Sequence, residues 1–212
     1  MNKLIVPKLT VLNNGFPNLD NEMPHAIAVE PWGNYAEKII VHFKIAHDDG
    51  HIYLQYTVSE TSIMAKTIEN NGCVWEDSCV EMFIGLENEA FYYNFEFNCI
   101  GTKLLAVGNS RHNRVFANEA ILDKIKVKST LDKEIFNEQK GNFSWQLSIV
   151  IPIKSFFKHK IHSLQNTIWA ANFYKCGDGL TTPHYLSWNN IETENPDFHT
   201  PQYFGKITFL GN

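Results

Sequence analysis

Trp75 and Trp188 stand among polar residues, in the segments V-W-E-D-S and L-S-W-N-N. A tryptophan that serves a hydrophobic core usually has apolar neighbours, as Trp145 and Trp169 have. An indole outside the core offers a flat apolar surface on which the C–H face of a sugar ring can lie. Each of these two indoles could also anchor a loop on the core, so the pair predicts a sugar clamp only if both flank one site.

Three expected strands place polar side chains near these tryptophans. In residues 80–84, 93–98 and 169–174 apolar residues alternate with polar ones, and successive strand residues point to opposite faces. If these strands share a sheet, its outer face carries Glu81, Asn94, Glu96, Asn98, Asn172 and Tyr174. Carboxylates, amides and a phenol can bind sugar hydroxyls through their donors and acceptors. The pattern predicts a binding face, although an ordinary solvated sheet face explains it too.

The elements that must position these residues are strands. β-branched, aromatic or alternating apolar runs predict strands at 38–46, 51–58, 80–84, 92–99, 143–151, 168–174 and 203–210. Regularly spaced strands with turn signals, such as Asp48-Asp49-Gly50, are typical of a sandwich or barrel. We therefore expect one all-β domain over residues 1–212, a two-sheet antiparallel β-sandwich of the jelly-roll or immunoglobulin-like type.

The segments between the strands are less regular. Residues 121–127 fit a strand or a short helix, and residues 153–157 fit one short turn of helix. Residues 101–120 and 176–202 are predicted to be long loops, and loops of this length in a compact domain are usually functional or disordered. The second loop is rich in aromatic residues, a composition that argues against disorder.

Composition and charge exclude two classes of protein. The formal net charge is -5 and the 18 Lys and Arg residues are scattered, which argues against nucleic-acid binding. No apolar run approaches the roughly 20 residues of a membrane-spanning helix. The first residues lack the apolar core of a secretory signal, so we expect a cytoplasmic protein, or an extracytoplasmic one if the N-terminus is truncated.

The four cysteines show no C-x-x-C spacing. Neither a zinc knuckle nor a redox motif is therefore indicated by the sequence. The cysteines are Cys73, Cys79, Cys99 and Cys176. Reduced and mostly buried thiols are expected, with a Cys73–Cys79 disulfide as the alternative.

Three segments together resemble the family 9 carbohydrate-binding modules and their bacterial relatives, which are related to the DOMON-type sandwiches. They are V-W-E-D-S-C-V-E-M-F-I (74–84), Y-Y-N-F-E-F-N-C-I-G-T (92–102), and a terminal block with A-N-F-Y-K-C-G-D, L-S-W-N-N and P-Q-Y-F-G-K-I-T-F. The resemblance covers roughly residues 20–210. It implies a β-sandwich that binds a mono- or oligosaccharide without catalysis, as modules of xylan-degrading enzymes do in carbohydrate catabolism.

The resemblance also implies roles for particular residues. Trp75 and Trp188 match the two tryptophans that clamp a sugar in the family, and Glu81 matches an acidic residue that binds hydroxyls. The family uses an arginine near the site, for which Arg111 or Arg114 is the candidate. With the acidic turn and the face residues, the expected ligand-binding set is Trp75, Trp188, Glu81, Asp77, Glu96, Asn98, Asn172, Tyr174 and Arg111. The family's structural calcium would use Asp48 and Asp49, unless these residues only form the hairpin turn.

Three alternatives to a binding module remain open at this level. Glu81 and Glu96 could be the acid–base pair of a glycoside hydrolase, which needs carboxylates about 5–5.5 or 6.5–9.5 Å apart. A haem-binding sandwich needs axial ligands, for which the candidates are Met64, Met82, His162 and His184. The third alternative is a sandwich that retains no ligand. Exposed sandwich edges leave the oligomeric state open.

Overall fold

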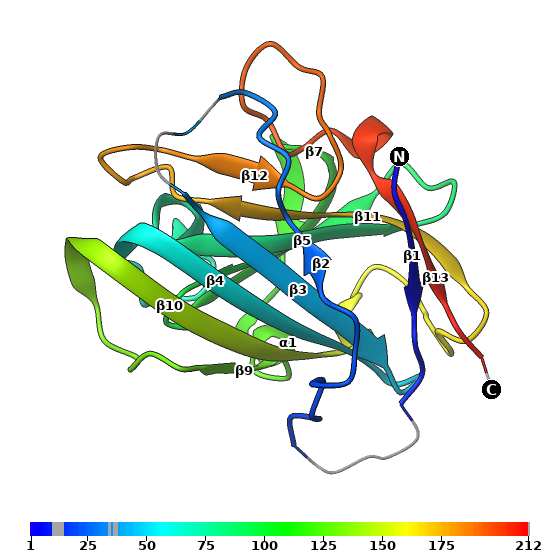
Figure 1. Ribbon diagram of the computed structural model, residues 1–212. Helices are drawn as coiled ribbons and strands as arrows, with labels where there is room; N and C mark the ends of the chain where they lie inside the picture. Colours follow the sequence, from blue (N-terminus) through cyan, green and yellow to red (C-terminus); the bar gives the residue numbers. More distant parts are fainter. Residues whose placement is uncertain (10–14, 34, 36–37, 212) are drawn as a thin grey trace.

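Two β-sheets pack face to face in the computed structural model, which describes residues 1–9, 15–33, 35 and 38–211 (Figure 1). Most strand pairs are antiparallel, and β1 (Lys3–Val6) with β13 (Gly205–Phe209) is a parallel pair. The expected all-β sandwich is confirmed. None of the helices in the described part of the chain is long and apolar enough to cross a membrane.

The larger sheet carries the site described below. Its strand order is β1-β13-β11-β5-β6-β7-β8, and β12 pairs with β11 as a side branch. The bounds of its remaining strands are β11 Ile168–Cys176, β5 Cys79–Leu86, β6 Tyr92–Asn98, β7 Lys103–Ser110, β8 Asn113–Phe116 and β12 Tyr185–Ser187.

The smaller sheet has the order β2-β3-β4-β10-β9. Its strands are β2 His25–Ala26, β3 Ile40–His47, β4 His51–Ala65, β10 Phe136–Pro152 and β9 Lys126–Ser129. Short helical turns connect strands, namely η1 Val74–Glu76, α1 Glu119–Leu122, η2 Ile153–Ser155 and η3 Pro201–Tyr203.

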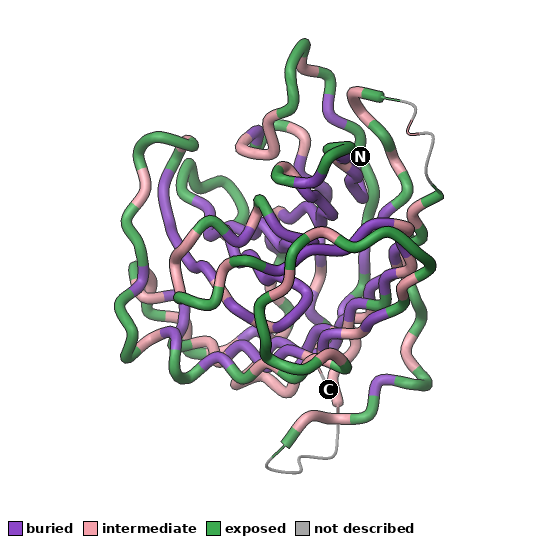
Figure 2. Tube along the Cα trace, turned by 90° about the vertical axis from the view of Figure 1, so that its left-hand side faces the viewer, coloured by how far each residue is buried: buried purple, intermediate pink, exposed green. Residues whose placement is uncertain are grey.

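Alternating side chains of both sheets form the core between them. Val80, Met82 and Ile84 of β5 are fully buried there, and Phe43 of β3 stacks on Phe173 of β11 with ring centroids 3.9 Å apart. In Figure 2 the buried residues fill the interior and the exposed ones lie around it. Burial of apolar side chains at about 25 cal/mol per Å² is the main force that holds the sheets together.

Each of the seven expected strands coincides with or overlaps a strand of the structure, and the predicted turn of helix lies at η2. The loop predicted at 101–120 is wrong, because this segment forms β7 and β8. β7 is buried on both faces, so it lacks the apolar–polar alternation that marks a half-exposed strand. The predicted loop at 176–202 contains the short strand β12, and residues 121–127 overlap α1 and β9.

Candidate functional site

A pocket of about 510 Å³, part of it open to solvent, lies on the outer face of the larger sheet. Its floor is formed by side chains of β5, β6 and β11, and its walls by η1, the turn after β7, β8 and the long segment after β12. The lining residues are Trp75, Glu81, Phe83, Glu96, Arg111, Arg114, Cys176, Asp178, Tyr185, Pro196, Asp197, Phe198 and His199.

Strand register brings the predicted polar residues onto this face. Glu81 of β5 lies opposite Glu96 of β6 on one side and Tyr174 of β11 on the other. Asn172 lies opposite Phe83, two residues further along the strands and on the same face. Because directly paired residues share a face, the alternation inferred from the sequence is correct for all three strands. The loops cover this face, so it is not the solvated sheet surface that the pattern also allowed.

Two buried carboxylates form the polar floor of the pocket. Glu81 is 2% exposed and its Oε1 accepts a hydrogen bond from the Cys176 thiol at 3.0 Å. Glu96 is 3% exposed, and its Oε1 accepts a hydrogen bond from the Asn94 amide at 2.7 Å and lies 3.8 Å from Arg114. Its Oε2 accepts no hydrogen bond from the described residues. Burial, and then repulsion by Glu96, raises the pKa of Glu81 well above its usual range. Burial raises the pKa of Glu96 to about 7.

Charged groups of both signs surround this floor. Two arginines line the pocket, Arg111 from the turn after β7 and Arg114 from β8. Burial raises the pKa of Asp178 to about 6, against the opposing effect of Arg111. His199 is placed by Tyr92, whose hydroxyl lies 2.8 Å from its Nδ1. Burial and the nearby arginines lower the pKa of His199 to about 3, so its imidazole is neutral at pH 7.

Aromatic rings complete the walls. The half-buried Trp75 from η1 lies on one wall. Phe198 belongs to another wall and stacks on Tyr174 with ring centroids 4.0 Å apart and an interplanar angle of 7°. The Tyr174 hydroxyl donates to the Phe198 carbonyl at 3.2 Å. Tyr174, which was predicted to contact the ligand, is fully buried, supports the wall from behind and does not line the pocket.

The predicted clamp between Trp75 and Trp188 is not confirmed, because only Trp75 lines the pocket. Trp188 is 7% exposed and belongs to the core, where it packs edge-on against Phe43 and Phe173. Strand pairing explains this position: Tyr185 lies opposite Cys176 on the pocket face, so alternation turns Trp188 inward beside Phe173. The sequence contained part of this signal, because Leu186 and Trp188 alternate with Tyr185 and Ser187. The same register identifies Tyr185 as one of the pocket aromatics that the sequence interpretation missed.

Asp77, Asn98 and Asn172, which were predicted to bind the ligand, anchor loops and do not line the pocket. Asp77 is 1% exposed and accepts from the Lys66 and Thr67 backbone N–H groups and from the Asn98 amide. Asn98 also donates to the Thr67 carbonyl at 2.8 Å. Buried polar side chains must find such partners, and here the partners belong to the protein.

Asn172 has the same kind of role on the other side of the pocket. Its Oδ1 accepts from the Asn189 backbone N–H at 2.9 Å, and its amide donates to the Asn189 carbonyl at 3.3 Å. These two bonds hold the chain after β12 against β11. The predicted site residues that do line the pocket are Trp75, Glu81, Glu96 and Arg111.

Asp48 and Asp49 form the hairpin turn and do not fit a calcium site. Asp48 accepts from the Gly50 and His51 backbone N–H groups at 3.0 and 2.7 Å. Asp49, with φ 77°, accepts from the Ser163 hydroxyl and from the Leu164 backbone N–H. The Ser163 hydrogen bond is the main cause that lowers the pKa of Asp49 to about 2. These donors direct their hydrogen atoms at the Asp48 and Asp49 carboxylate oxygens, which a calcium ion would need as ligands.

The candidate haem ligands do not fit an axial pair. Met82 is buried in the core between the sheets, and His184 Nε2 lies 2.7 Å from Lys175 Nζ in a separate buried cluster. Burial and the Lys175 charge lower the pKa of His184 to about 2. Met64, the third candidate, is buried, and His162 is exposed. The pocket lining contains none of these four residues.

The cysteines are all free thiols, with Cys73 exposed and the other three buried. The expectation of reduced and mostly buried thiols is therefore met, and the alternative Cys73–Cys79 disulfide does not form.

The chain belongs to carbohydrate-binding family 9, whose family model matches residues 18–209. A candidate carbohydrate-binding protein from Bacteroides uniformis ATCC 8492 has a crystal structure that is 39% identical in sequence, with a TM-score of 0.92 and 98% of each chain covered. The family resemblance inferred from the three sequence segments is thus confirmed. A search of curated proteins gave no match.

More distant solved structures share the fold. A family 9 carbohydrate-binding module from Caldicellulosiruptor kristjanssonii in complex with glucose is 14% identical, with a TM-score of 0.61 and coverage of 100% of this chain and 97% of that chain. A module of the same family and organism in complex with cellotriose is 14% identical, with a TM-score of 0.62 and coverage of 100% and 95%.

Proposed function

We propose that this protein binds the terminal or single residue of a β-linked saccharide in the pocket beside Trp75, and that it does not transform the sugar. Membership of carbohydrate-binding family 9 supports saccharide binding, and the family 9 structures with glucose and cellotriose indicate which sugars to test first. The observation that carries the location is the combination of an indole, buried carboxylates and two arginines around one pocket.

The pocket offers a pyranose ring both an apolar surface and hydrogen-bonding groups. Trp75 gives an apolar surface for the C–H groups of a sugar ring, and Tyr185 and Phe198 add aromatic surface elsewhere in the lining. The free Oε2 of Glu96 accepts a hydrogen bond from a sugar hydroxyl, and an unsatisfied buried acceptor of this kind costs about 1–3 kcal/mol until it is filled. Arginine donors at the rim complete the hydroxyl contacts.

Trp75 therefore acts with the other aromatic walls and not with Trp188. A binding site with one tryptophan depends strongly on that residue, because hot-spot truncations cost about 2 kcal/mol or more. We expect weak to moderate affinity, since the pocket is open on one side and a monosaccharide buries little surface.

Calorimetric titration of glucose, cellotriose and xylan-derived oligosaccharides into the full chain tests this proposal. We expect measurable binding that the Trp75→Ala variant weakens by at least about thirtyfold, which corresponds to 2 kcal/mol. The matched control is Phe91→Ala, which removes an exposed aromatic ring outside the pocket and should leave the affinity unchanged. Equal affinities of wild type and Trp75→Ala would refute the assigned site.

One observation favours a second candidate, a glycoside hydrolase. Glu81 and Glu96 lie directly opposite each other across β5 and β6, and the pKa of each is raised, as in sites that need one protonated and one ionised carboxyl group. Release of reducing sugar from xylan or cello-oligosaccharides that is lost in Glu96→Gln would establish hydrolysis. Binding with no product after prolonged incubation would leave the binding role.

A further inference from the structure

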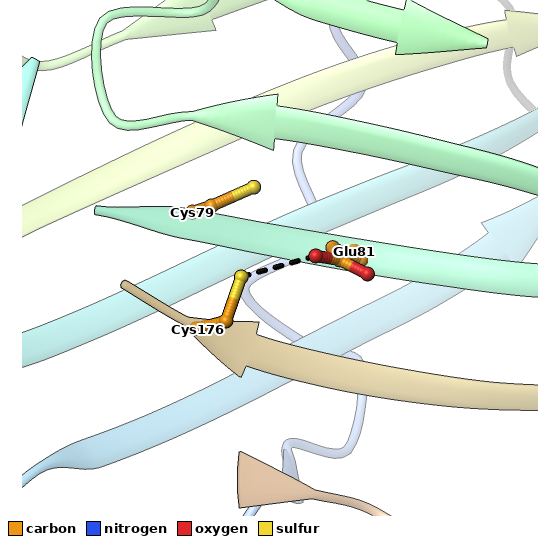
Figure 3. Close-up of side chains that lie close together, drawn as sticks. All are labelled: Cys79, Glu81 and Cys176. Carbon is orange, nitrogen blue, oxygen red and sulfur yellow. Dashed lines mark hydrogen bonds between the residues drawn. The ribbon is translucent and has the colours of Figure 1, made fainter. Parts of the chain in front are cut away.

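Two thiols and a carboxylate converge at the pocket floor, where sugar binding gives the thiols no role. Cys79 and Glu81 are two residues apart on β5 and therefore share the outer face, and Cys176 at the end of β11 lies directly opposite Cys79. Figure 3 shows the three side chains close together, with the bond between Cys176 and Glu81 drawn as a dashed line. The two sulfur atoms and a Glu81 oxygen all lie within 4.8 Å of one another.

We propose that Cys79, Glu81 and Cys176 bind a thiophilic divalent cation, for which zinc is the physiological choice, with a fourth coordination position open to the pocket. Zinc takes thiolate sulfur at about 2.3 Å and carboxylate oxygen at about 2.0–2.2 Å in a tetrahedron, so its ligand atoms lie roughly 3.5–4 Å apart. In the observed cluster the ligand atoms lie within 4.8 Å of one another, and Cys176 Sγ lies 3.0 Å from Glu81 Oε1. All three ligands stand on two paired strands, which hold them more rigidly than loops would.

The direction of the open position follows from burial. Glu81 and Cys176 line the pocket, whereas Cys79 is fully buried beneath it. A cation held by the three would therefore meet the pocket on its remaining side, where water or a ligand oxygen can complete the tetrahedron. Three protein ligands with one open position is the arrangement of zinc sites that bind an exogenous ligand.

Charge is compatible with this site. Two thiolates and a carboxylate carry three negative charges, so one divalent cation leaves a single negative charge; burial and Glu96 raise the pKa of Glu81, and Arg114 opposes this shift. A bound cation deprotonates a coordinating thiol, so binding releases protons and strengthens as pH rises.

Packing alone accounts for the thiols but not for the carboxylate. Cys79 and Cys176 belong to a small apolar cluster with Val74, Leu104 and Ala106, as free cysteines often do. Glu81, at 2% exposure, stands beside this cluster with a thiol as its hydrogen-bond donor. Cys99 provides the contrast, because its thiol lies in the main core and donates to the Met64 carbonyl with no carboxylate involved.

Titration of cobalt(II) into the reduced full chain, without saccharide and without oxygen, tests the site. We expect a near-ultraviolet sulfur-to-cobalt charge-transfer band that saturates at about one equivalent and disappears when zinc is added. The band should be strongly reduced in Cys79→Ser and Cys176→Ser and retained in the matched controls Cys73→Ser and Cys99→Ser. No charge-transfer band in the wild type, or a band that is unchanged in both Cys79→Ser and Cys176→Ser, would overturn the proposal.

A second variant decides the matter if the serine substitutions prevent folding. Glu81→Gln keeps both thiols and nearly the same shape, so it should keep the charge-transfer band while weakening cobalt affinity by at least about tenfold. Unchanged affinity in folded Glu81→Gln would overturn the three-ligand site. Because no saccharide is present, failure of sugar binding leaves this result intact, and failure of metal binding leaves the proposed saccharide function intact.

Discussion

Substitution of Lys175 by methionine should strongly destabilise the protein, because it leaves a carboxylate alone in the interior. Lys175 is fully buried and its Nζ lies 2.8 Å from Glu60 Oε2, 2.7 Å from His184 Nε2 and 3.0 Å from the Cys176 carbonyl. Glu60 is 3% exposed and its Oε1 accepts from Trp145 at 2.6 Å. The cluster ties β4 and β10 of one sheet to β11 of the other, immediately beneath the strand end that reaches the pocket.

The magnitude follows from burial. Removing one partner of a buried ion pair costs about 3–5 kcal/mol, because the remaining charge has lost both water and its counter-ion. For a domain of this length each kcal/mol shifts Tm by about 2–4 °C, so Lys175→Met should lower Tm by roughly 6–20 °C. The matched control is Lys206→Met: Lys206 forms an ion pair with Glu87 at 2.6 Å, but these side chains are 49% and 39% exposed. Exposed pairs contribute about 0–1 kcal/mol, so the control should shift Tm by at most about 4 °C.

Urea unfolding followed by tryptophan fluorescence and circular dichroism measures both variants. The double variant Lys175→Met/Glu60→Gln should be more stable than Lys175→Met alone, because glutamine is neutral and still accepts from Trp145. Equal stability losses for Lys175→Met and Lys206→Met, or a double variant that is less stable than the single one, would refute the argument from burial.

Two further predictions concern Trp188 in the core and the buried His184. Trp188→Ala should cost about 3–5 kcal/mol of unfolding free energy by leaving a cavity beside Phe43 and Phe173, while the folded fraction keeps its sugar affinity; a lost affinity with unchanged stability would restore the two-tryptophan clamp. For His184, the folded pKa of about 2 lies below the usual 6.5, so its contribution to stability is present above pH 6.5 and is lost as pH falls toward 2. His184→Gln should therefore lose less stability than wild type between pH 7 and pH 4 in urea titrations; identical pH dependence of the two would contradict this.

The sequence was sufficient to assign side chains to a sheet face where one face of a strand differs in polarity from the other. Glu81, Glu96 and Asn172 were placed correctly because each alternates with apolar neighbours that pack between the sheets. The alternation could not tell a ligand contact from a loop anchor, however. Asn98 alternates with apolar residues as Glu96 does, and only its hydrogen bonds to the Thr67 carbonyl and the Asp77 carboxylate reveal a structural role.

The predicted position of Trp188 differs from the structure for another reason. Its polar neighbours Ser187, Asn189 and Asn190 indicate a surface position, but tertiary pairing of β12 with β11 buries it. Ser187 and Asn189 are themselves buried, so the polarity of neighbours misreads exposure here. The pocket aromatics Tyr185 and Phe198 come from a segment with little regular structure, and the position of such a segment depends on contacts that are distant in sequence, such as Phe198 on Tyr174.

The central claim, that a saccharide binds beside Trp75 and not beside Trp188, has a direct test in the indole N–H resonances of the five tryptophans. In ¹⁵N-labelled protein, assigned by single substitutions, titration with cellotriose should shift the Trp75 resonance most. The resonances of the buried Trp145, Trp169 and Trp188 should stay in place. A shift of Trp188 with Trp75 unchanged would contradict the account.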